Sequence, residues 1–146
     1  MIYKSVSGVR SLVQILGEED YERLECIQWC PTRFQVFVEG TNIRVHTVGS
    51  EVFATAIQTE ATDYRYAQRQ GSEVELYSIE LPAELAERCA RLASVLGLAF
   101  AGIALKIASH GHIYCFEVNP SPAFSYYESY TGQPIAQTVA QYIGGK

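Results

Sequence analysis

The feature that most constrains the fold is the stretch CFEVNPSPAFSYYE, residues 115–128, in which an apolar strand ends at two prolines. Side chains alternate across a β-strand, so Glu117 and Asn119 are expected on one face and Phe116 and Val118 on the other. Proline lacks the N–H donor that a strand ladder needs, so the strand ends where these two oxygen-bearing side chains are presented. Such a strand end is a candidate site for a hard cation.

The composition predicts one ordinary folded domain. The chain has 146 residues, of which 48% are hydrophobic and 18% charged, enough to form a core. The net charge of -5 and the scattered Lys and Arg residues give no basic stripe, so we expect no nucleic-acid surface. The longest apolar run, residues 95–105, is shorter than the roughly 18–20 residues of a membrane span. With no basic and apolar leader, we expect a cytoplasmic protein that contacts no membrane.

The cysteines predict free thiols. They form no CxxC pair and lie in apolar or helical contexts, at Cys26, Cys30, Cys89 and Cys115. This spacing favours buried thiols over a disulfide framework or a zinc site.

Alternating apolar residues predict antiparallel strands. Three such segments follow one another, at residues 33–40, 43–48 and 51–57. Gly49-Ser50 links the last two and is typical of a type II′ hairpin. A second hairpin is predicted between residues 101–108 and 112–118.

Helical spacing predicts helices in three further regions. Residues 11–27 indicate one or two short helices broken near Gly17, and residues 78–100 hold the clearest helix, with Pro82 in its first turn. Residues 131–145 close the chain as a helix. The predicted class is α+β, with mostly antiparallel sheets and flanking helices.

Lys4 is the first candidate for binding an anion. It leaves an apolar segment beside a loop of small residues that includes Ser7, Gly8 and Arg10. A lysine there can hold a phosphate as a point charge while backbone N–H groups approach closely, although the GxxxxGK[ST] motif is absent. The alternative is an exposed lysine near a turn.

Three further side chains carry a charge that is costly without a partner. Arg44 lies in the middle of a strand, on the same face as His46, and Arg65 follows the third strand near Asp63. A surface ion pair is the alternative explanation for the arginines. Glu117, in an apolar strand, needs either a metal ion or an arginine partner.

Taken in order, five segments of the chain resemble the ATP-grasp superfamily. They are YKSVSGVRS, RFQVFVEGTNIRVHTVG, VFATAIQTEATDYRYA, LGLAFAGIALKI and YCFEVNPSPAFSYYE. The resemblance covers nearly the whole chain and is closest to the branch of ribosomal-protein glutamate ligases and peptide-macrocyclising (graspetide) ligases. It implies an ATP site between two antiparallel sheets, where ATP phosphorylates a carboxylate to an acylphosphate that an amine then attacks.

The resemblance also implies roles for individual residues. For the nucleotide, Lys4 matches a lysine that contacts the phosphates, Ser7, Gly8 and Arg10 lie in the loop that covers them, and Gln35, Val36, Phe37 and Val38 match the hinge that binds adenine through its backbone. For the chemistry, Arg44 and Arg65 match arginines that face phosphate or the acylphosphate, and Glu117 and Asn119 match Mg²⁺ ligands. The implied cofactors are ATP and Mg²⁺.

The chain departs from the family pattern at three positions. Ala104 stands where the family has an aspartate that binds metal, Val36 where a glutamate is usual, and Asn42 where an aspartate precedes the strand arginine. Loss of the carboxylate at position 104 is expected to weaken binding of a second Mg²⁺.

The expected organisation is a single ATP-grasp-like domain fragment over residues 1–146. Residues 1–40 would be the remaining portion of the lid and residues 41–146 the central sheet and helices, with the Rossmann-like N-terminal domain and part of the lid absent.

Three hypotheses for function follow. The first is a protein that binds ATP and Mg²⁺ and is related to ATP-dependent carboxylate–amine ligases; the second is an inactive remnant that serves as a binding or regulatory module. The third is a structural domain in which Arg44 or Arg65 neutralises Glu117. Expected partners are ATP, a carboxylate and an amine of unknown identity, and either a separate N-terminal chain or a second copy joined through an exposed sheet edge.

Overall fold

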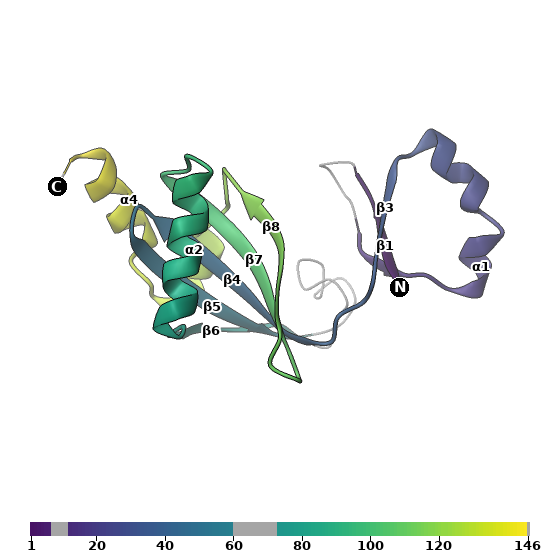
Figure 1. Ribbon diagram of the computed structural model, residues 1–146, viewed down its shortest axis with the longest axis horizontal. Helices are drawn as coiled ribbons and strands as arrows, with labels where there is room; N and C mark the ends of the chain where they lie inside the picture. Colours follow the sequence, from purple (N-terminus) through teal and green to yellow (C-terminus); the bar gives the residue numbers. More distant parts are fainter. Residues whose placement is uncertain (7–11, 60–72, 146) are drawn as a thin grey trace. The chain divides into compact units, whose positions relative to one another are not determined.

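The computed structural model describes residues 1–6, 12–59 and 73–145, which form two compact units. Unit 1 comprises Met1–Val38 and Thr59–Val74, and unit 2 comprises Glu39–Gln58 and Glu75–Lys146 (Figure 1). In the described part of the chain no helix has both the length and the apolar character needed to cross a membrane.

Unit 1 contains a three-stranded antiparallel sheet in the order β2-β1-β3. The strands are β1 (Ile2–Ser5), β2 (Gln14–Ile15) and β3 (Thr32–Gln35), and the helix α1 (Glu18–Tyr21) and the 3-10 helix η1 (Leu24–Trp29) connect β2 to β3. The Asp20 carboxylate accepts hydrogen bonds from the Gly17 backbone N–H, at 2.9 Å, and from the Tyr3 hydroxyl, at 2.8 Å. These two bonds tie the start of α1 to the sheet.

Two details of unit 1 differ from the sequence predictions. Residues 12–16, the described part of the segment before Gly17, form no helix, because Gln14 and Ile15 pair with Tyr3 and Ile2 along the edge of β1. The backbone hydrogen bonds offered by that edge outweigh the helical spacing of the local apolar residues. In addition, β3 pairs with β1, so the first of the three predicted consecutive strands belongs to a different sheet from the other two.

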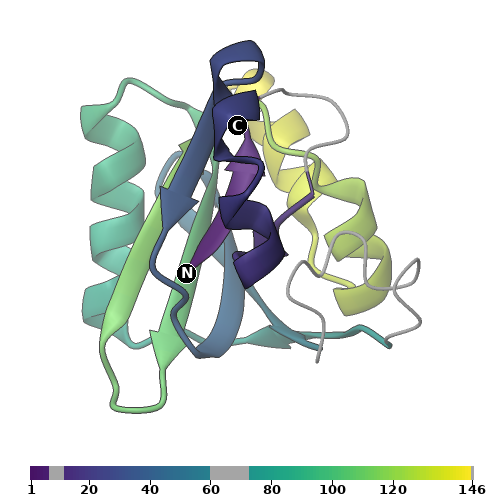
Figure 2. The ribbon, with the colours of Figure 1, turned by 90° about the vertical axis from the view of Figure 1, so that its right-hand side faces the viewer.

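Unit 2 is built on a five-stranded antiparallel sheet in the order β6-β5-β4-β7-β8. The strands are β4 (Gly40–Val48), β5 (Glu51–Gln58), β6 (Glu75–Ile79), β7 (Phe100–Ala108) and β8 (Ile113–Asn119). Helix α2 (Ala83–Val95) covers one face, and helices α3 (Ser125–Thr131) and α4 (Ile135–Ile143) lie on the other, so the strands of this unit stand between them in Figure 2.

The apolar core of unit 2 lies between the sheet and α2. Leu85 and Cys89 of the helix pack in one cluster with Val45, Ile103 and Leu105 of the central strands. Ile103 and Val45 are fully buried, and burial raises the pKa of the Cys89 thiol. The helix starts directly after a proline, as predicted, because a missing N–H costs nothing in a first turn.

The α+β class with mainly antiparallel sheets is confirmed, as are both hairpins and the closing helix. Two elements of unit 2, β6 and α3, were not predicted. The strand β6 is a short edge strand, and the segment SYYESYT of α3 shows no apolar stripe at helical spacing.

All four cysteines are free thiols, but the prediction that they are buried is wrong for three of them. Only Cys89 is buried, whereas Cys26, Cys30 and Cys115 are exposed. Two of these lie in or next to the 3-10 helix of unit 1 and the third on the edge strand β8, where a thiol meets solvent.

Candidate functional site in unit 2

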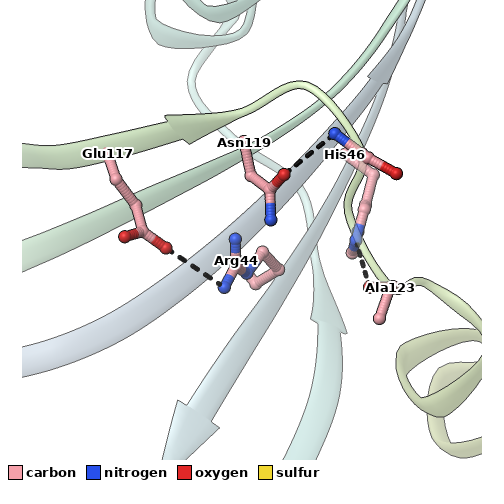
Figure 3. Close-up of polar contacts among 6 residues, drawn as sticks. Arg44, His46, Glu117, Asn119 and Ala123 are labelled. Atoms are coloured by element: carbon pink, nitrogen blue, oxygen red, sulfur yellow. Dashed lines mark hydrogen bonds and ion pairs between the residues drawn. The ribbon is translucent and has the colours of Figure 1, made fainter. Parts of the chain in front are cut away.

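Three neighbouring strands place the candidate residues of unit 2 side by side. Across β4, β7 and β8, Arg44 pairs with Ala104 and Ala104 with Glu117. Directly opposite residues of an antiparallel pair project to the same face, so these side chains form one row across the sheet. Figure 3 shows the side chains of Arg44, Glu117 and Asn119 pointing to the same side of the sheet.

A second row lies one step along the strands. His46 pairs with Gly102, and Gly102 pairs with Asn119. In both rows the middle strand, β7, contributes only a hydrogen or a methyl group. The polar side chains of β4 and β8 therefore face each other across a shallow strip of small residues.

A β-bulge at Phe116 keeps Glu117 on this face. Ala104 pairs with Glu117 and Leu105 pairs with Cys115, so Phe116 is the extra residue. Cys115 consequently borders the same cavity as Cys89, on the α2 side of the sheet. The prediction that Glu117 and Asn119 share a face is confirmed, but regular alternation stops before Glu117.

The Arg44 guanidinium lies over the small residues of β7. Its Nη2 is 4.0 Å from Glu117 Oε1, and its Cζ is 5.8 Å from the centre of the Tyr127 ring of α3. A Cβ atom added to Gly102 would stand 3.3 Å from Nη1. The Arg44 side chain is only 11% exposed but that of Glu117 is 44% exposed, so solvent screens the ion pair to less than about 1 kcal/mol.

After β8 the chain turns back over the sheet. The Ser121 N–H donates to Asn119 Oδ1 at 2.8 Å, and His46 Nε2 donates to the Ala123 carbonyl at 3.2 Å (Figure 3). Between them, Pro122 packs directly on Gly102, where an added Cβ would lie 2.5 Å from the proline Cβ. The proline-containing segment thus ends β8 and also carries the chain across β7 to β4.

His46 is fully buried and holds the far end of this turn. Burial, reinforced by the Arg44 charge, lowers its pKa to about 4, although the bond to Ala123 acts in the opposite direction. The ring is therefore neutral near pH 7, with its proton on Nε2. It stacks on Phe100 at 6.2 Å and is tilted against Tyr127 at 5.0 Å between ring centres.

Two residues of this face had no role in the sequence predictions. His46 was placed beside Arg44 without a function, and Lys106 was not considered. Lys106 lies two residues beyond Ala104 on β7, paired with Asn42, and burial lowers its pKa. A lysine inside an apolar strand was the available signal, because such a charge is costly without a cleft or a partner.

The donor set fits a magnesium ion that is held partly by phosphate. Glu117 offers a carboxylate that is half exposed, and Asn119 Oδ1 keeps a second lone pair beside its bond to Ser121. Mg²⁺ is usually bound through one or two carboxylates together with substrate phosphates and water. Across the described residues, no group of three His, Cys, Asp or Glu side chains forms a metal site.

The remaining candidate residues belong to unit 1 or lie outside the described residues. Lys4, in β1, borders a cavity of about 370 Å³. Gln35 ends β3, and Val36, Phe37 and Val38 continue to the boundary of unit 1 without strand structure. Ser7, Gly8, Arg10 and Arg65 lie outside the described residues.

Comparison with known proteins identifies the family of the chain. The model of the RimK-like ATP-grasp domain matches residues 4–143. A probable alpha-L-glutamate ligase of Ectopseudomonas mendocina (strain ymp) is 32% identical over 105 residues, which are 71% of this chain and 34% of that protein. One from Hahella chejuensis is also 32% identical, over 108 residues, with 73% and 35% of the two chains covered.

Solved structures show the same fold. The ATP-grasp ligase PsnB, complexed with a phosphomimetic variant of its minimal precursor, Mg and ADP, superposes with a TM-score of 0.75 at 28% identity, covering 97% of this chain and 46% of PsnB. The macrocyclase MdnC, bound with the precursor peptide MdnA from Microcystis aeruginosa MRC, gives a TM-score of 0.82 at 21% identity, covering 99% and 48%.

The class of protein defined by this fold and these matches is the ATP-grasp ligases. Within that class, the chain belongs to the family of the RimK-like ATP-grasp domain. It spans about a third of the length of the curated relatives and about half of the solved ligases.

Proposed function

We propose that this chain forms the nucleotide- and Mg²⁺-binding part of an ATP-dependent carboxylate–amine ligase. The observation that carries the proposal is the row Arg44, Ala104 and Glu117 with Asn119 beside it, which groups a cation, a carboxylate and an amide oxygen on one sheet face. PsnB, which is 28% identical, is described as complexed with Mg and ADP.

In the proposed reaction a substrate carboxylate oxygen attacks the γ-phosphorus of ATP, ADP leaves, and an acylphosphate forms. An amine then attacks the acyl carbon, loses a proton, and releases inorganic phosphate. Positioning and positive charge dominate the catalysis of such transfers. Arg44 and Arg65 would supply that charge at the phosphoryl and acyl groups.

The proposed nucleotide contacts come from unit 1. Lys4 and the loop with Ser7, Gly8 and Arg10 would hold the phosphates, and the backbone of Gln35 to Val38 would bind adenine. Glu117 and Asn119 would hold Mg²⁺, which when bound neutralises phosphate charge. A second, Asp-dependent ion is not proposed, because Ala104 provides no oxygen ligand.

A specific observation favours a second candidate function, an inactive module that binds nucleotide or a partner. The Arg44 guanidinium approaches Glu117 above Ala104, so the carboxylate already has a counter-charge. Arg44 and Lys106 place two positive charges on the face that carries Glu117. Such a face suits phosphate better than a pair of metal ions.

Calorimetric titration of ATP, with and without Mg²⁺, tests the proposal. We expect binding that Mg²⁺ strengthens in the natural chain, and loss of this Mg²⁺ effect in Glu117→Ala. The matched control is Glu87→Ala, an exposed glutamate on α2 at the opposite face of the sheet. No heat of binding at millimolar ATP would contradict the proposed site.

The chain spans about a third of the length of the curated ligases and about half of the solved ones. We propose that ligase activity also involves a separate chain or a second copy, with a carboxylate and an amine as substrates. The relatives point to an amino acid or a peptide, since they are probable glutamate ligases and precursor-bound peptide ligases. Sedimentation velocity would test for self-association, which a monomer at all accessible concentrations would exclude.

A further inference from the structure

We propose that His46 is a positioning residue that fixes the segment after β8 and thereby aims Asn119 Oδ1 into the site. The inference rests on the proposed function, because Asn119 is a proposed Mg²⁺ ligand. His46 and Arg44 both lie on β4. This one strand would therefore supply a charge to the site and also hold the turn that carries the proposed metal ligand.

Three contacts define how the turn is held. At its start, the Ser121 N–H donates to Asn119 Oδ1 at 2.8 Å and orients the amide. In the middle, Pro122 rests on Gly102 of β7. At its end, His46 donates to the Ala123 carbonyl at 3.2 Å. The turn is thus anchored on β8, β7 and β4 in succession.

Only the β4 anchor depends on a polar side chain from another strand. The His46 ring is 0% exposed and is held between Phe100 and Tyr127. A ring so enclosed has few alternative rotamers, so its Nε2–H is directed at the carbonyl before any ligand arrives. Groups that orient a metal ligand in this way commonly change metal affinity by about 10- to 100-fold when they are removed.

Because the turn is short, the position of the Ala123 carbonyl restricts the position of the Asn119 side chain. Ala123 is four residues from Asn119, and a proline on each side of Ser121 limits the backbone φ angles available between them. Releasing the Ala123 carbonyl therefore leaves the turn held across the sheet by the Pro122 contact, and by the edge-on packing of the next residue, Phe124, against Phe100 of β7. The hydrogen bond from Ser121 to Asn119 should then open more often.

The test compares three variants of the full chain. His46→Phe keeps an aromatic ring between Phe100 and Tyr127 but removes the donor, and His46→Gln restores an N–H donor. The control is Thr55→Val, which removes the Thr55 hydroxyl bond to Gln133 Oε1, at 3.1 Å, elsewhere on the same buried face.

The first measurement is hydrogen exchange of the Ser121 amide by NMR without ligand. We expect exchange about tenfold faster in His46→Phe than in the natural chain, partial recovery in His46→Gln, and no change in Thr55→Val. Unchanged exchange at Ser121 in His46→Phe overturns the inference, whether or not the chain binds nucleotide.

The second measurement is the Mg²⁺ concentration needed for half-maximal enhancement of ATP binding. We expect this Mg²⁺ concentration to rise about tenfold in His46→Phe. In Thr55→Val we expect it to stay unchanged, when the two variants lose the same thermal stability relative to the natural chain. An equal shift in both variants would mean a merely structural role and would overturn the inference. If even the natural chain shows no Mg²⁺-dependent ATP binding, the proposed function fails, and the Ser121 exchange alone decides whether His46 fixes the turn.

Discussion

The two faces of the five-stranded sheet are built from the same strands but bury different chemistry. Between the sheet and α2 the buried cluster is apolar, with Val45, Ile103 and Leu105 at its centre. One polar residue of β4, the fully buried Thr47, lies on that side, two residues from Val45. The face toward α3 and α4 instead encloses Arg44, His46 and Thr55, of which the last two are fully buried. Alternate residues of β4 serve the two faces, so stability and the candidate site are separated by a single step along one strand.

The difference between the two faces predicts how substitutions affect stability and ligand binding. Burying polar groups costs free energy unless each finds a partner, and an apolar face would have been the cheaper way to pack α3 and α4. Stability alone therefore does not explain why this face of the sheet in unit 2 is polar. Substitutions on the α2 face should change stability, whereas substitutions of Arg44 or His46 on the polar face should change ligand binding as well.

The largest expected effect is on the α2 face. Ile103→Ala removes a side chain that is fully buried at the centre of the core, and the loss should be about 2–5 kcal/mol of unfolding free energy. Urea titration followed by circular dichroism measures it. In the fraction that stays folded, ATP affinity should be unchanged, and a parallel loss of affinity would contradict the separation of the two faces.

The next effect is a pH dependence of stability that belongs to the polar face. The pKa of His46 is lowered to about 4 in the folded chain, while that of an unfolded histidine is about 6.5. The unfolded state therefore binds the proton first as the pH falls. The stabilisation is complete above pH 6.5 and is lost progressively between about pH 6.5 and 4, by up to about 3 kcal/mol.

The groups that face His46 do not change their charge between pH 7.5 and 4. Arg44, on its own strand, stays positive throughout this range, Tyr127 from α3 is neutral, and the Ala123 carbonyl does not titrate. Thermal unfolding of the natural chain and of His46→Phe, measured from pH 7.5 to 4, isolates the histidine. Identical pH profiles for the two chains would refute the assignment.

A smaller effect is expected at Gly102 of β7, on which the turn after β8 packs. In Gly102→Ala the new Cβ would lie 2.5 Å from the Pro122 Cβ, so the turn after β8 must move. Overpacking of this kind costs about 1–3 kcal/mol. Ala101→Gly, at the neighbouring buried position, is the control, since it removes volume without touching the turn. Faster amide exchange at Ser121 in Gly102→Ala alone would tie the cost to the turn.

The sequence predicted most of unit 2 because its signals are local. Alternation in β4 and β5, the two-residue turn at Gly49, and the proline before α2 each depend on a few neighbouring residues. Glu117 and Asn119 were placed on one face for the same reason. The helix predicted before Gly17 was wrong because strand pairing with β1, a contact across the chain, decides that segment.

The rest of the site depends on contacts that no short stretch encodes. The bulge at Phe116 follows from how β8 registers on β7, and the bond from His46 to Ala123 joins positions 77 residues apart. The pairing of Arg44 with Glu117 was one of two alternatives, and only the row across β7 brings the two within 4.0 Å. Long-range register, rather than local propensity, completes the polar face.

The smallest effect on stability but the sharpest on function should come from Ala104→Asp. The new carboxylate would stand between Arg44 and Glu117 in the row, where it gains the guanidinium as a partner but repels Glu117, so the net change in unfolding free energy should stay within about 1 kcal/mol. A second carboxylate raises the affinity of an oxygen site for a divalent cation, because affinity depends on the number of charged ligands. Calorimetry should therefore show ATP binding that requires several-fold less Mg²⁺, while Ala104→Asn, equal in size but uncharged, should show little change. If both variants behave alike, the site for the metal does not lie beside Ala104, and the polar face would then serve phosphate through Arg44 and Lys106.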